Sequence, residues 1–437
     1  MLEDSAGELS LLLSKCPQLG EHTVAPPALR PFEGMGTAAH HLTALLRGGC
    51  NDARAHAALG NVLVREGRYL DAVEAYRAAV ELDPTFAQAH IATADLSYIL
   101  RDEESASAHI ASALWLQRVF PDPLEIGSRT PVLLLLRDAP YAVNTPLEML
   151  LDRSAFALHK VFVDTSEPLP ELPPYAVAVT AFGFARDAAA ERAAAFLRAS
   201  GSPAVNDPER IAGTARERLP ETLAGIASLV AVPSQRVPRD ELVAGDAVTL
   251  VRPADSQAGE GLALVDSAAV LAAHLERFPS GSYHVSPFID YRSADGWYRK
   301  YRVIFVDGVA FPYHLAIAPR WMVHYQSAPM REHAWMRDEE LTFLADPRRA
   351  IAGWDAFMPA IARAVGLDYF GIDAAVLPDG RLLVFEADSG MLVHDEDPSD
   401  VFAAKRPYVA RIREALTAAL RRRAGKDAPS GGSKSPA

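Results

Sequence analysis

The spacing of apolar and polar positions divides this chain into a helical first part and a mixed second part. Between residues 53 and 86, small and bulky apolar side chains recur at helical spacing, and Pro84 ends the pattern. The positions that carry the pattern are Leu59, Gly60, Ala72, Tyr76 and Ala79. Because small residues allow two antiparallel helices to approach closely, the pattern predicts a helical hairpin of 34 residues.

This helical hairpin recurs in weaker form on both sides. The matching residues, 34 positions later or earlier, are Ala94, Ala106, Ile110, Ala113, Ala38 and Leu42. The pattern resembles the tetratricopeptide repeat, and the resemblance implies helical repeats over residues 1–121 that recruit a protein partner. An ordinary helical bundle is the alternative. In either case about two repeats bury little surface alone, so we expect the module to pack on the rest of the chain or on another subunit.

Pro121-Asp122-Pro123 breaks the helical pattern, and strands and helices alternate after it. We expect strands at 132–136, 161–163 and 176–180 and helices at 147–158 and 187–199. This alternation predicts a small parallel α/β domain over residues 131–205.

After residue 206 the pattern predicts helices rich in Arg and Leu and then a series of strands. Strands are expected at 248–251, 262–265, 283–287, 302–306 and 309–314, and a closing helix at 403–423. The last segment, 426–437, has the Pro, Gly, Ser and Lys content of a disordered tail. The predicted fold class is therefore multidomain, with all-α helical repeats followed by an α/β domain and by an α+β domain over residues 206–425.

The most informative chemical pattern is a hairpin over residues 372–388. Asp379-Gly380 between two apolar runs predicts a two-residue turn. This turn places Asp373 opposite Glu386, with Asp388 on the same face as Glu386. Like charges in a direct cross-strand pair repel, so three carboxylates here indicate a bound cation. Hard oxygen ligands suit Mg²⁺ held together with nucleotide phosphates. The alternative is a set of exposed charges at the end of a surface hairpin.

Candidate phosphate-binding residues precede this hairpin. Arg252 ends a strand and is followed by a loop that contains Gly259 and Gly261, whose backbone N–H groups can close over phosphates. Lys300 and Arg302 are two apart on a strand, so both cations lie on one face. A second turn, Asp307-Gly308, is expected to place Arg302 opposite Tyr313. The end of another strand, Pro287-Phe288-Ile289, offers backbone groups to an adenine edge.

In this order, from Pro131 onward, the motifs resemble the ATP-grasp superfamily, and most closely the branch of the ligase that adds glutamate to a ribosomal protein. The resemblance implies a pre-ATP-grasp domain at 131–205, an ATP-grasp domain at 206–425, and Mg²⁺ on Asp373, Glu386 and Asp388. It also implies that Arg302 lies beside the transferred phosphate. The residues expected to contact the nucleotide are Arg252, Gly259, Gly261, Pro287, Phe288, Ile289, Lys300 and Asn206. Arg320 is the candidate for clamping a substrate carboxylate.

Three positions depart from the family pattern. Asp388 replaces the usual asparagine, which adds negative charge to the metal site. Arg252 replaces a phosphate-binding lysine, and its guanidinium keeps the charge and adds a bidentate fork. Lys300 lies where an acidic residue is common, and nothing in the sequence explains that change.

The resemblance implies an ATP-dependent carboxylate–amine ligase that uses ATP and Mg²⁺. The γ-phosphoryl group moves to a substrate carboxylate, and an amine attacks the acyl phosphate to give an amide, ADP and phosphate. The expected substrate is an amino acid, a peptide or a protein tail. Two alternatives remain open, namely a nucleotide-binding adaptor without turnover and a helical scaffold with a structural α/β appendage.

Composition narrows the function classes further. The 437 residues are 49% hydrophobic and 23% charged, which is typical of globular proteins of two or three domains. A net charge of −13 argues against a nucleic-acid partner. Cys16 and Cys50 are the only cysteines, which indicates a reducing compartment rather than a disulfide framework. Because the N-terminus is acidic and no apolar run approaches about 18 residues, we expect a cytoplasmic protein with no membrane contact.

Overall fold

The fold is described from a computed structural model of the chain. The described residues are 40, 42–44, 46, 52–65, 68–100, 102–122, 127–138, 143–145, 147–164, 169, 171–183, 188–254, 256, 259–325, 327–393 and 400–425. Contacts divide the chain into two units, residues 1–141 with 153–175 and residues 142–152 with 176–437. The domain boundaries drawn from the sequence stay predictions. Ala38 and the expected tail at 426–437 lie outside the described residues.

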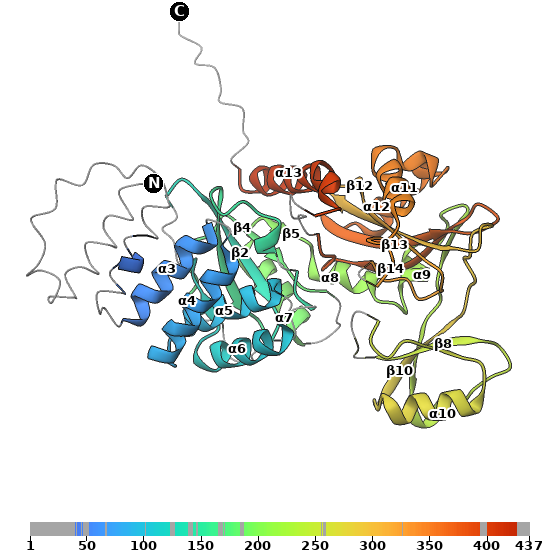
Figure 1. Cartoon of the computed structure of the whole chain (residues 1–437), viewed down its shortest axis with the longest axis horizontal. Helices are drawn as coiled ribbons and strands as arrows, with labels where there is room; N and C mark the ends of the chain where they lie inside the picture. The colour runs from blue at the N-terminus through green and yellow to red at the C-terminus, as the bar shows by residue number, and fades with distance from the viewer. Residues whose placement is uncertain are drawn as a thin grey trace, which may run out of the picture. The chain divides into compact units, whose positions relative to one another are not determined.

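Between Ala53 and Leu116 the described part of the first unit forms two helical hairpins (Figure 1). Their helices are α3 (Ala53–Arg65), α4 (Tyr69–Leu82), α5 (Ala87–Ile99) and α6 (Glu103–Leu116). Helices α3 and α5 begin at residues 53 and 87, and α4 and α6 begin at residues 69 and 103. Both pairs are thus 34 residues apart, which confirms the repeat length that the sequence predicts.

The small residues of the repeat pack as expected. Positions related by 34 residues are buried in both hairpins, namely Ala72, Tyr76 and Ala79 in α4 and Ala106, Ile110 and Ala113 in α6. A Cβ atom added to Gly60 would lie 2.6 Å from the ring of Tyr76. Glycine at this position therefore lets the tyrosine ring lie directly against α3, because any side chain would collide with it.

The described residues of the first unit also form three strands. They are β1 (Val119–Phe120), β2 (Thr130–Leu136) and β3 (Phe156–Phe162). Strand β3 pairs in parallel with β2 and antiparallel with β1, and all seven of its residues are buried. Lys160 of β3 forms a salt bridge of 2.6 Å with Asp95 of α5. The helical repeats therefore pack on a strand of the chain itself, as expected.

The helix predicted over residues 147–158 is wrong. Only Leu147–Met149 form a turn of 3₁₀ helix, and strand β3 begins at Phe156. The segment is rich in helix-forming residues, but a run of buried positions that pairs with a neighbouring strand overrides local propensity.

The second unit contains a small α/β segment and a four-stranded sheet. The first consists of β4 (Val177–Thr180), α7 (Ala188–Ser200) and β5 (Ala204–Val205), with β4 and β5 parallel. The sheet has the order β7 (Gln235–Pro238), β10 (Ser282–Pro287), β8 (Thr249–Pro253) and β9 (Ala263–Val265). Helix α10 (Ala268–Arg277) packs on this antiparallel sheet, whose core includes Val251, Leu271 and Tyr283.

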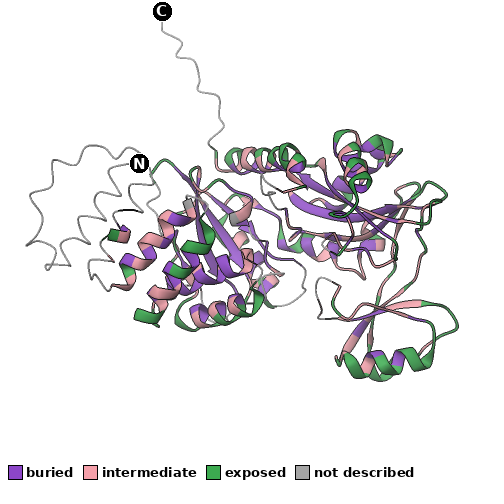
Figure 2. Ribbon diagram, viewed as in Figure 1, coloured by how far each residue is buried: buried purple, intermediate pink, exposed green. Residues whose placement is uncertain are grey.

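A five-stranded sheet forms the larger core of the second unit. Its order is β12 (Val309–Ala318), β11 (Tyr298–Val306), β13 (Tyr369–Val376), β14 (Leu382–Asp388) and β6 (Leu229–Ala231). The helices around it are α8 (Pro208–Ile211), α9 (Leu219–Thr222), α11 (Ala334–Ala345), α12 (Trp354–Val365) and α13 (Arg406–Arg423). Figure 2 shows the strands of this sheet as an almost continuous buried layer.

The order of elements confirms the predicted fold class, with helical repeats first and mixed α/β and α+β segments after them. The strands expected after residue 206 are all present, and the closing helix begins within a few residues of its predicted start. No helix in the described parts of the chain combines the length and the apolar character that a membrane crossing requires.

Candidate functional site

The turn between β13 and β14 differs from the predicted one. The backbone N–H of Gly380 donates to the carbonyl of Leu377 over 2.8 Å, so Pro378 and Asp379 are the central residues of the turn. Gly380 follows them with a φ of 84°. The two-residue turn expected at Asp379-Gly380 is therefore wrong. Proline favours the second position of a turn, and this preference outweighs the Asp-Gly signal.

A β-bulge corrects the register that this turn sets. Near the turn Val376 faces Leu382, one residue away from the predicted pairing. The register then shifts between Asp373 and Ala374, so Asp373 faces Glu386, as the sequence predicts. The carboxylate pair therefore depends on the bulge as well as on the turn.

Strands β11 and β12 show a similar arrangement. Their turn is Asp307-Gly308, as predicted, with φ angles of 47° and 78°. A register shift after Arg302 leaves Tyr313 outside the direct pairs, and Arg302 faces His314. The predicted pairing of Arg302 with Tyr313 is therefore wrong, because a hairpin count cannot detect a bulge.

Together these pairs form one polar row across four strands. The row runs from His314 on β12 through Arg302 on β11 and Asp373 on β13 to Glu386 on β14. A bulge lies directly beside two of its members, Arg302 and Asp373. Bulges often redirect side chains at functional sites, so the row is the centre of the candidate site.

Two cations bind the carboxylate of Asp373. The Nε and Nη2 atoms of Arg302 donate to its two oxygens over 2.7 and 2.9 Å, and Nζ of Lys300 lies 2.9 Å away. Burial alone raises the pKa of Asp373, but Arg302 and Lys300 outweigh it and hold the pKa well below its usual range. Asp373 is therefore ionised and neutralised from within the sheet.

Glu386 is neutralised by a residue that sequence reasoning missed. Nη2 of Arg216 lies 2.5 Å from Oε2 of Glu386. Burial and the neighbouring Asp373 raise the pKa of Glu386, but Arg216 with the two cations of β11 lowers it overall. Arg216 lies between Thr214 and α9, in a segment without a motif, so no local signal in the sequence points to it.

Arg252 is a buried cation without a carboxylate partner among the described residues. Its guanidinium donates to the carbonyl and the hydroxyl of Ser256, and on the neighbouring strand it faces His284. Burial and the nearby Arg216 lower the pKa of Arg252 to about 10. A buried guanidinium beside a second one is stabilised by an anion, which suits phosphate oxygens.

The glycine loop approaches its neighbours closely. Gly259 and Gly261 have φ angles of 79° and 63°. A Cβ atom added to Gly259 would lie 2.5 Å from the His324 ring, and one added to Gly261 would lie 2.7 Å from Pro253. Both positions therefore require glycine. Contact of this loop with phosphates stays a prediction.

Asn206 does not belong to the polar row. Its side chain bonds the backbone of Asp368 and Tyr369 with three hydrogen bonds of 2.7 to 3.0 Å. Its φ of 60° directs the chain from β5 toward α8. The residue thus fastens the end of β5 to β13, and its nucleotide contact stays a prediction.

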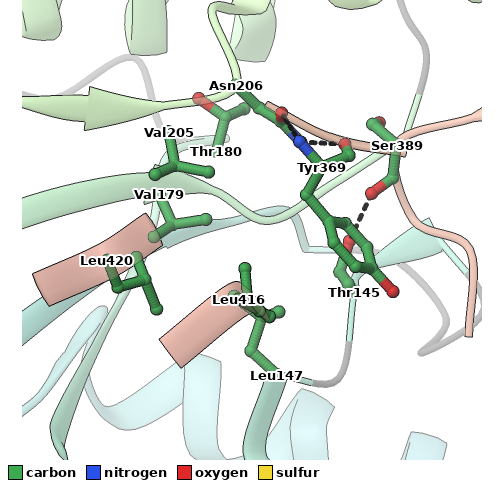
Figure 3. Close-up of a pocket in the computed structure, with 10 residues that line it drawn as sticks. All are labelled: Thr145, Leu147, Val179, Thr180, Val205, Asn206, Tyr369, Ser389, Leu416 and Leu420. Atoms are coloured by element: carbon green, nitrogen blue, oxygen red, sulfur yellow. Dashed lines mark hydrogen bonds between the residues drawn. The ribbon is translucent and has the colours of Figure 1, made fainter. Parts of the chain in front are cut away.

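Asn206 instead lines a small cavity of about 10 Å³, which holds one water molecule at most. Figure 3 shows Asn206 beside Tyr369, with the hydroxyl of Thr145 donating to the carbonyl of Ser389 nearby. The cavity also contacts Leu147, Val179, Thr180, Val205, Leu416 and Leu420. A volume of this size is far too small for a nucleotide.

The remaining candidates lie in other positions. The N–H of Phe288 donates to Val248, and Pro287 has none, so a backbone donor to an adenine edge has to come from Ile289 or beyond. Arg320 is exposed after the end of β12. The roles of these residues stay predictions.

The donor set suits Mg²⁺ with two carboxylates rather than three. No group of three or more His, Cys, Asp or Glu side chains in the described part of the chain is placed to hold a metal ion. Both oxygens of Asp373 already accept from cations. Asp388 accepts one hydrogen bond, from Gly390, and burial together with Glu386 raises its pKa to about 6. A cation between Glu386 and Asp388 would relieve this repulsion, and Mg²⁺ commonly uses one or two carboxylates with phosphates.

Comparison with known proteins supports the helical repeats. A family described as TPR repeat matches residues 60–98, which confirms the tetratricopeptide prediction for that segment. No curated protein matches the chain.

Solved structures similar to the chain include ATP-grasp proteins, the superfamily that the motif order resembles. D-alanine–D-alanine ligase from Bacillus anthracis complexed with ATP has 12% identity and a TM-score of 0.40, and the match covers 67% of this chain and 98% of that one. D-alanyl-alanine synthetase A from Vibrio cholerae has 13% identity, a TM-score of 0.44 and coverages of 67% and 99%. A RimK domain protein ATP-grasp from Sphaerobacter thermophilus has 15% identity and a TM-score of 0.38, and the match covers 67% of this chain and 98% of that one. All three TM-scores are below 0.5.

Proposed function

We propose that the chain is an ATP-dependent carboxylate–amine ligase that forms an amide through an acyl phosphate and releases ADP and phosphate. The observation that carries this proposal is Arg252, a buried guanidinium that bonds no described carboxylate and lies close to Arg216. Lys300 and Arg302 add two further cations beside Glu386. Four cations around a few carboxylates suit a polyphosphate with its metal ion.

Each side chain has a proposed role. Arg252 and the backbone at Gly259 and Gly261 hold the phosphates. Lys300 and Arg302 face the transferred phosphoryl group from β11. The metal ligands are Glu386 and Asp388, with Asp373 as the third carboxylate of the site. Ile289 contacts the adenine together with its neighbours Pro287 and Phe288. Asn206 contacts the nucleotide, and Arg320 clamps a substrate carboxylate.

The chemistry follows from the charges of these residues. A bound Mg²⁺ would neutralise part of the charge on the γ-phosphoryl group. The guanidinium of Arg302 and the ammonium of Lys300 stabilise the charge that develops on that group as the substrate carboxylate attacks it. The glycine loop excludes water from the acyl phosphate, which otherwise hydrolyses before the amine arrives.

The decisive experiment mixes the full chain with Mg²⁺, ATP and a pool of amino acids and peptides. ADP, rather than AMP, is the expected product, and added hydroxylamine should trap the acyl phosphate as a hydroxamate. The variant Arg252→Met should lose most ADP release while it stays folded, and Arg348→Met, which removes an exposed arginine paired with Asp355, serves as the control. Release of AMP, or full activity of Arg252→Met, would contradict the proposal.

A second function, nucleotide binding without turnover, is favoured by one observation. Asp373 is neutralised by two cations and is not part of a described three-carboxylate group. In this case the helical repeats recruit a partner protein and the nucleotide regulates the complex. Calorimetry that detects ATP binding, together with no ADP and no hydroxamate across the acceptor pool, would favour the adaptor over the ligase.

A further inference from the structure

The segment around Arg216 contacts both sheets of the second unit. Arg216 bonds Glu386 on β14, in the five-stranded sheet. The next residue, Glu217, lies 3.4 Å from Nδ1 of His284 on β10, in the four-stranded sheet. Adjacent side chains of one short segment therefore connect the strand that carries the proposed metal ligands with the sheet that carries Arg252.

Arg216 faces two groups of opposite character. Its guanidinium bonds Glu386, and the adjacent Glu217 lies beside His284, the residue that faces Arg252 across β10 and β8. Arg216 also lowers the pKa of Arg252, which agrees with this placement. Arg252 bonds no described carboxylate, whereas Arg216 holds one oxygen of Glu386 at 2.5 Å. Arg216 thus lies close to the proposed phosphate site, but its charge is neutralised by a carboxylate of the proposed metal site.

We propose that Arg216 is a polyphosphate-binding residue that Glu386 holds in reserve, and that exchange of this ion pair couples divalent-cation binding to polyphosphate binding. This inference rests on the proposed nucleotide site. When both ligands bind, phosphate oxygens replace the carboxylate on Arg216, and Glu386 turns to the cation. No covalent bond changes in this step.

Either ligand alone leaves one partner of the ion pair without compensation. A cation that takes Glu386 leaves the Arg216 guanidinium close to the buried Arg252, which is unfavourable. A polyphosphate that takes Arg216 leaves Glu386 directly opposite Asp373, where two carboxylates repel. When both ligands are present, every charge has a partner. Each ligand therefore removes a competitor of the other, which makes the binding cooperative.

The test measures the two ligands separately and together on the full chain. Electron paramagnetic resonance gives the affinity for Mn²⁺ alone, and calorimetry gives the affinity for a non-hydrolysable ATP analogue in EDTA. Both are then repeated with the other ligand at saturation. In the unmodified chain we expect Mn²⁺ to bind about tenfold or more tightly when the analogue is present.

Two variants should shift these affinities in opposite directions. Arg216→Met frees Glu386, so Mn²⁺ alone should bind about fivefold more tightly, while the metal-free analogue binds about tenfold more weakly. Glu386→Gln frees Arg216, so the metal-free analogue should bind more tightly while Mn²⁺ binding is lost. Arg299→Met, which removes another ion-paired arginine from β11, is the matched control and should change neither affinity.

The outcomes separate this inference from the proposed function. If the unmodified chain binds no analogue with or without Mn²⁺, the proposed nucleotide site is wrong and the inference fails with it. If the analogue binds but Arg216→Met weakens both ligands, or leaves both unchanged, the reserve role alone is overturned. Should Arg216→Met fail to fold by circular dichroism, Glu386→Gln decides, because unchanged metal-free affinity in that variant contradicts the exchange.

Discussion

Arg302 and Asp373 face each other directly across β11 and β13 and are joined by two parallel hydrogen bonds of 2.7 and 2.9 Å. Bidentate pairs between arginine and a carboxylate are among the strong hydrogen-bonded ion pairs, and this carboxylate is almost entirely buried. Burial lowers the pKa of Arg302, but Asp373 outweighs it and raises the pKa above its usual range. The pair therefore keeps both charges inside the sheet.

The first prediction concerns the stability of this pair. Asp373→Asn leaves Arg302 and Lys300 without their carboxylate, so we expect the free energy of unfolding to fall by about 3–5 kcal/mol. Urea unfolding measures the loss of free energy, and hydrogen exchange in β11 and β13 measures the local loss of protection. Asp295→Asn removes an exposed partner of Arg299 on the same strand and should cost no more than about 1 kcal/mol. Equal losses in the two variants would contradict the buried role of Asp373.

A second prediction tests how the helical repeats are attached. Lys160 of β3 donates to both oxygens of Asp95 on α5 at 2.6 and 2.7 Å. Asp95→Asn should speed hydrogen exchange in α5 and destabilise the first unit by about 3 kcal/mol, because it removes the carboxylate from a buried ammonium. The double variant Asp95→Asn/Lys160→Met should recover much of that loss. A loss in the double variant equal to the sum of the losses in Asp95→Asn and Lys160→Met would show that the pair has no coupling.

The third prediction is a pH dependence in the repeats. Nε2 of His90 lies 3.1 Å from the Pro84 carbonyl and therefore carries a proton. Nδ1 of His90 then accepts a hydrogen bond of 3.0 Å from Nδ1 of His109. Burial, and then His90, lower the pKa of His109. The folded state therefore binds protons less readily than the unfolded state, whose pKa is about 6.5. Stability from this site is complete above that pH and is lost as the pH falls below it.

Hydrogen exchange in α5 and α6 at about pH 7.5 and pH 5.5 measures this effect. After correction for intrinsic rates, protection should fall at the lower pH, and His109→Gln should flatten the profile. His333→Gln, at an exposed position outside the repeats, is the control and should keep the original profile. A profile that His109→Gln leaves unchanged would assign the pH dependence to other groups.

A fourth prediction concerns the glycine loop. Gly259→Ala would place a methyl group against His324, so we expect the loop to move and the affinity for Mg²⁺-ATP to fall about tenfold. Gly296→Ala is the matched control, because Gly296 also has positive φ but open space around it. If both variants bind nucleotide equally well, the contact with His324 has no part in the site. His324→Ala combined with Gly259→Ala should recover part of the affinity.

The periodic parts of the fold were predictable from the sequence because their signals are local. Helices α4 and α6 bury alanines at the expected offsets, and the turn at Asp307-Gly308 has the positive φ angles that its residues favour. The opposite case is residues 147–158, where helix-forming residues precede and enter a buried strand. There, pairing with β2 decided the structure, and no local pattern reports on such pairing.

By itself the sequence determined that Asp373 and Glu386 share a hairpin, because alternation and a nearby turn leave few registers for a short strand pair. Only the tertiary structure decided what neutralises them. Arg216 reaches Glu386 across 170 residues, and Arg302 reaches Asp373 across 71. The two bulges that align the polar row likewise depend on pairing with neighbouring strands. Ion pairs between distant segments follow from packing, so no spacing in the chain encodes them.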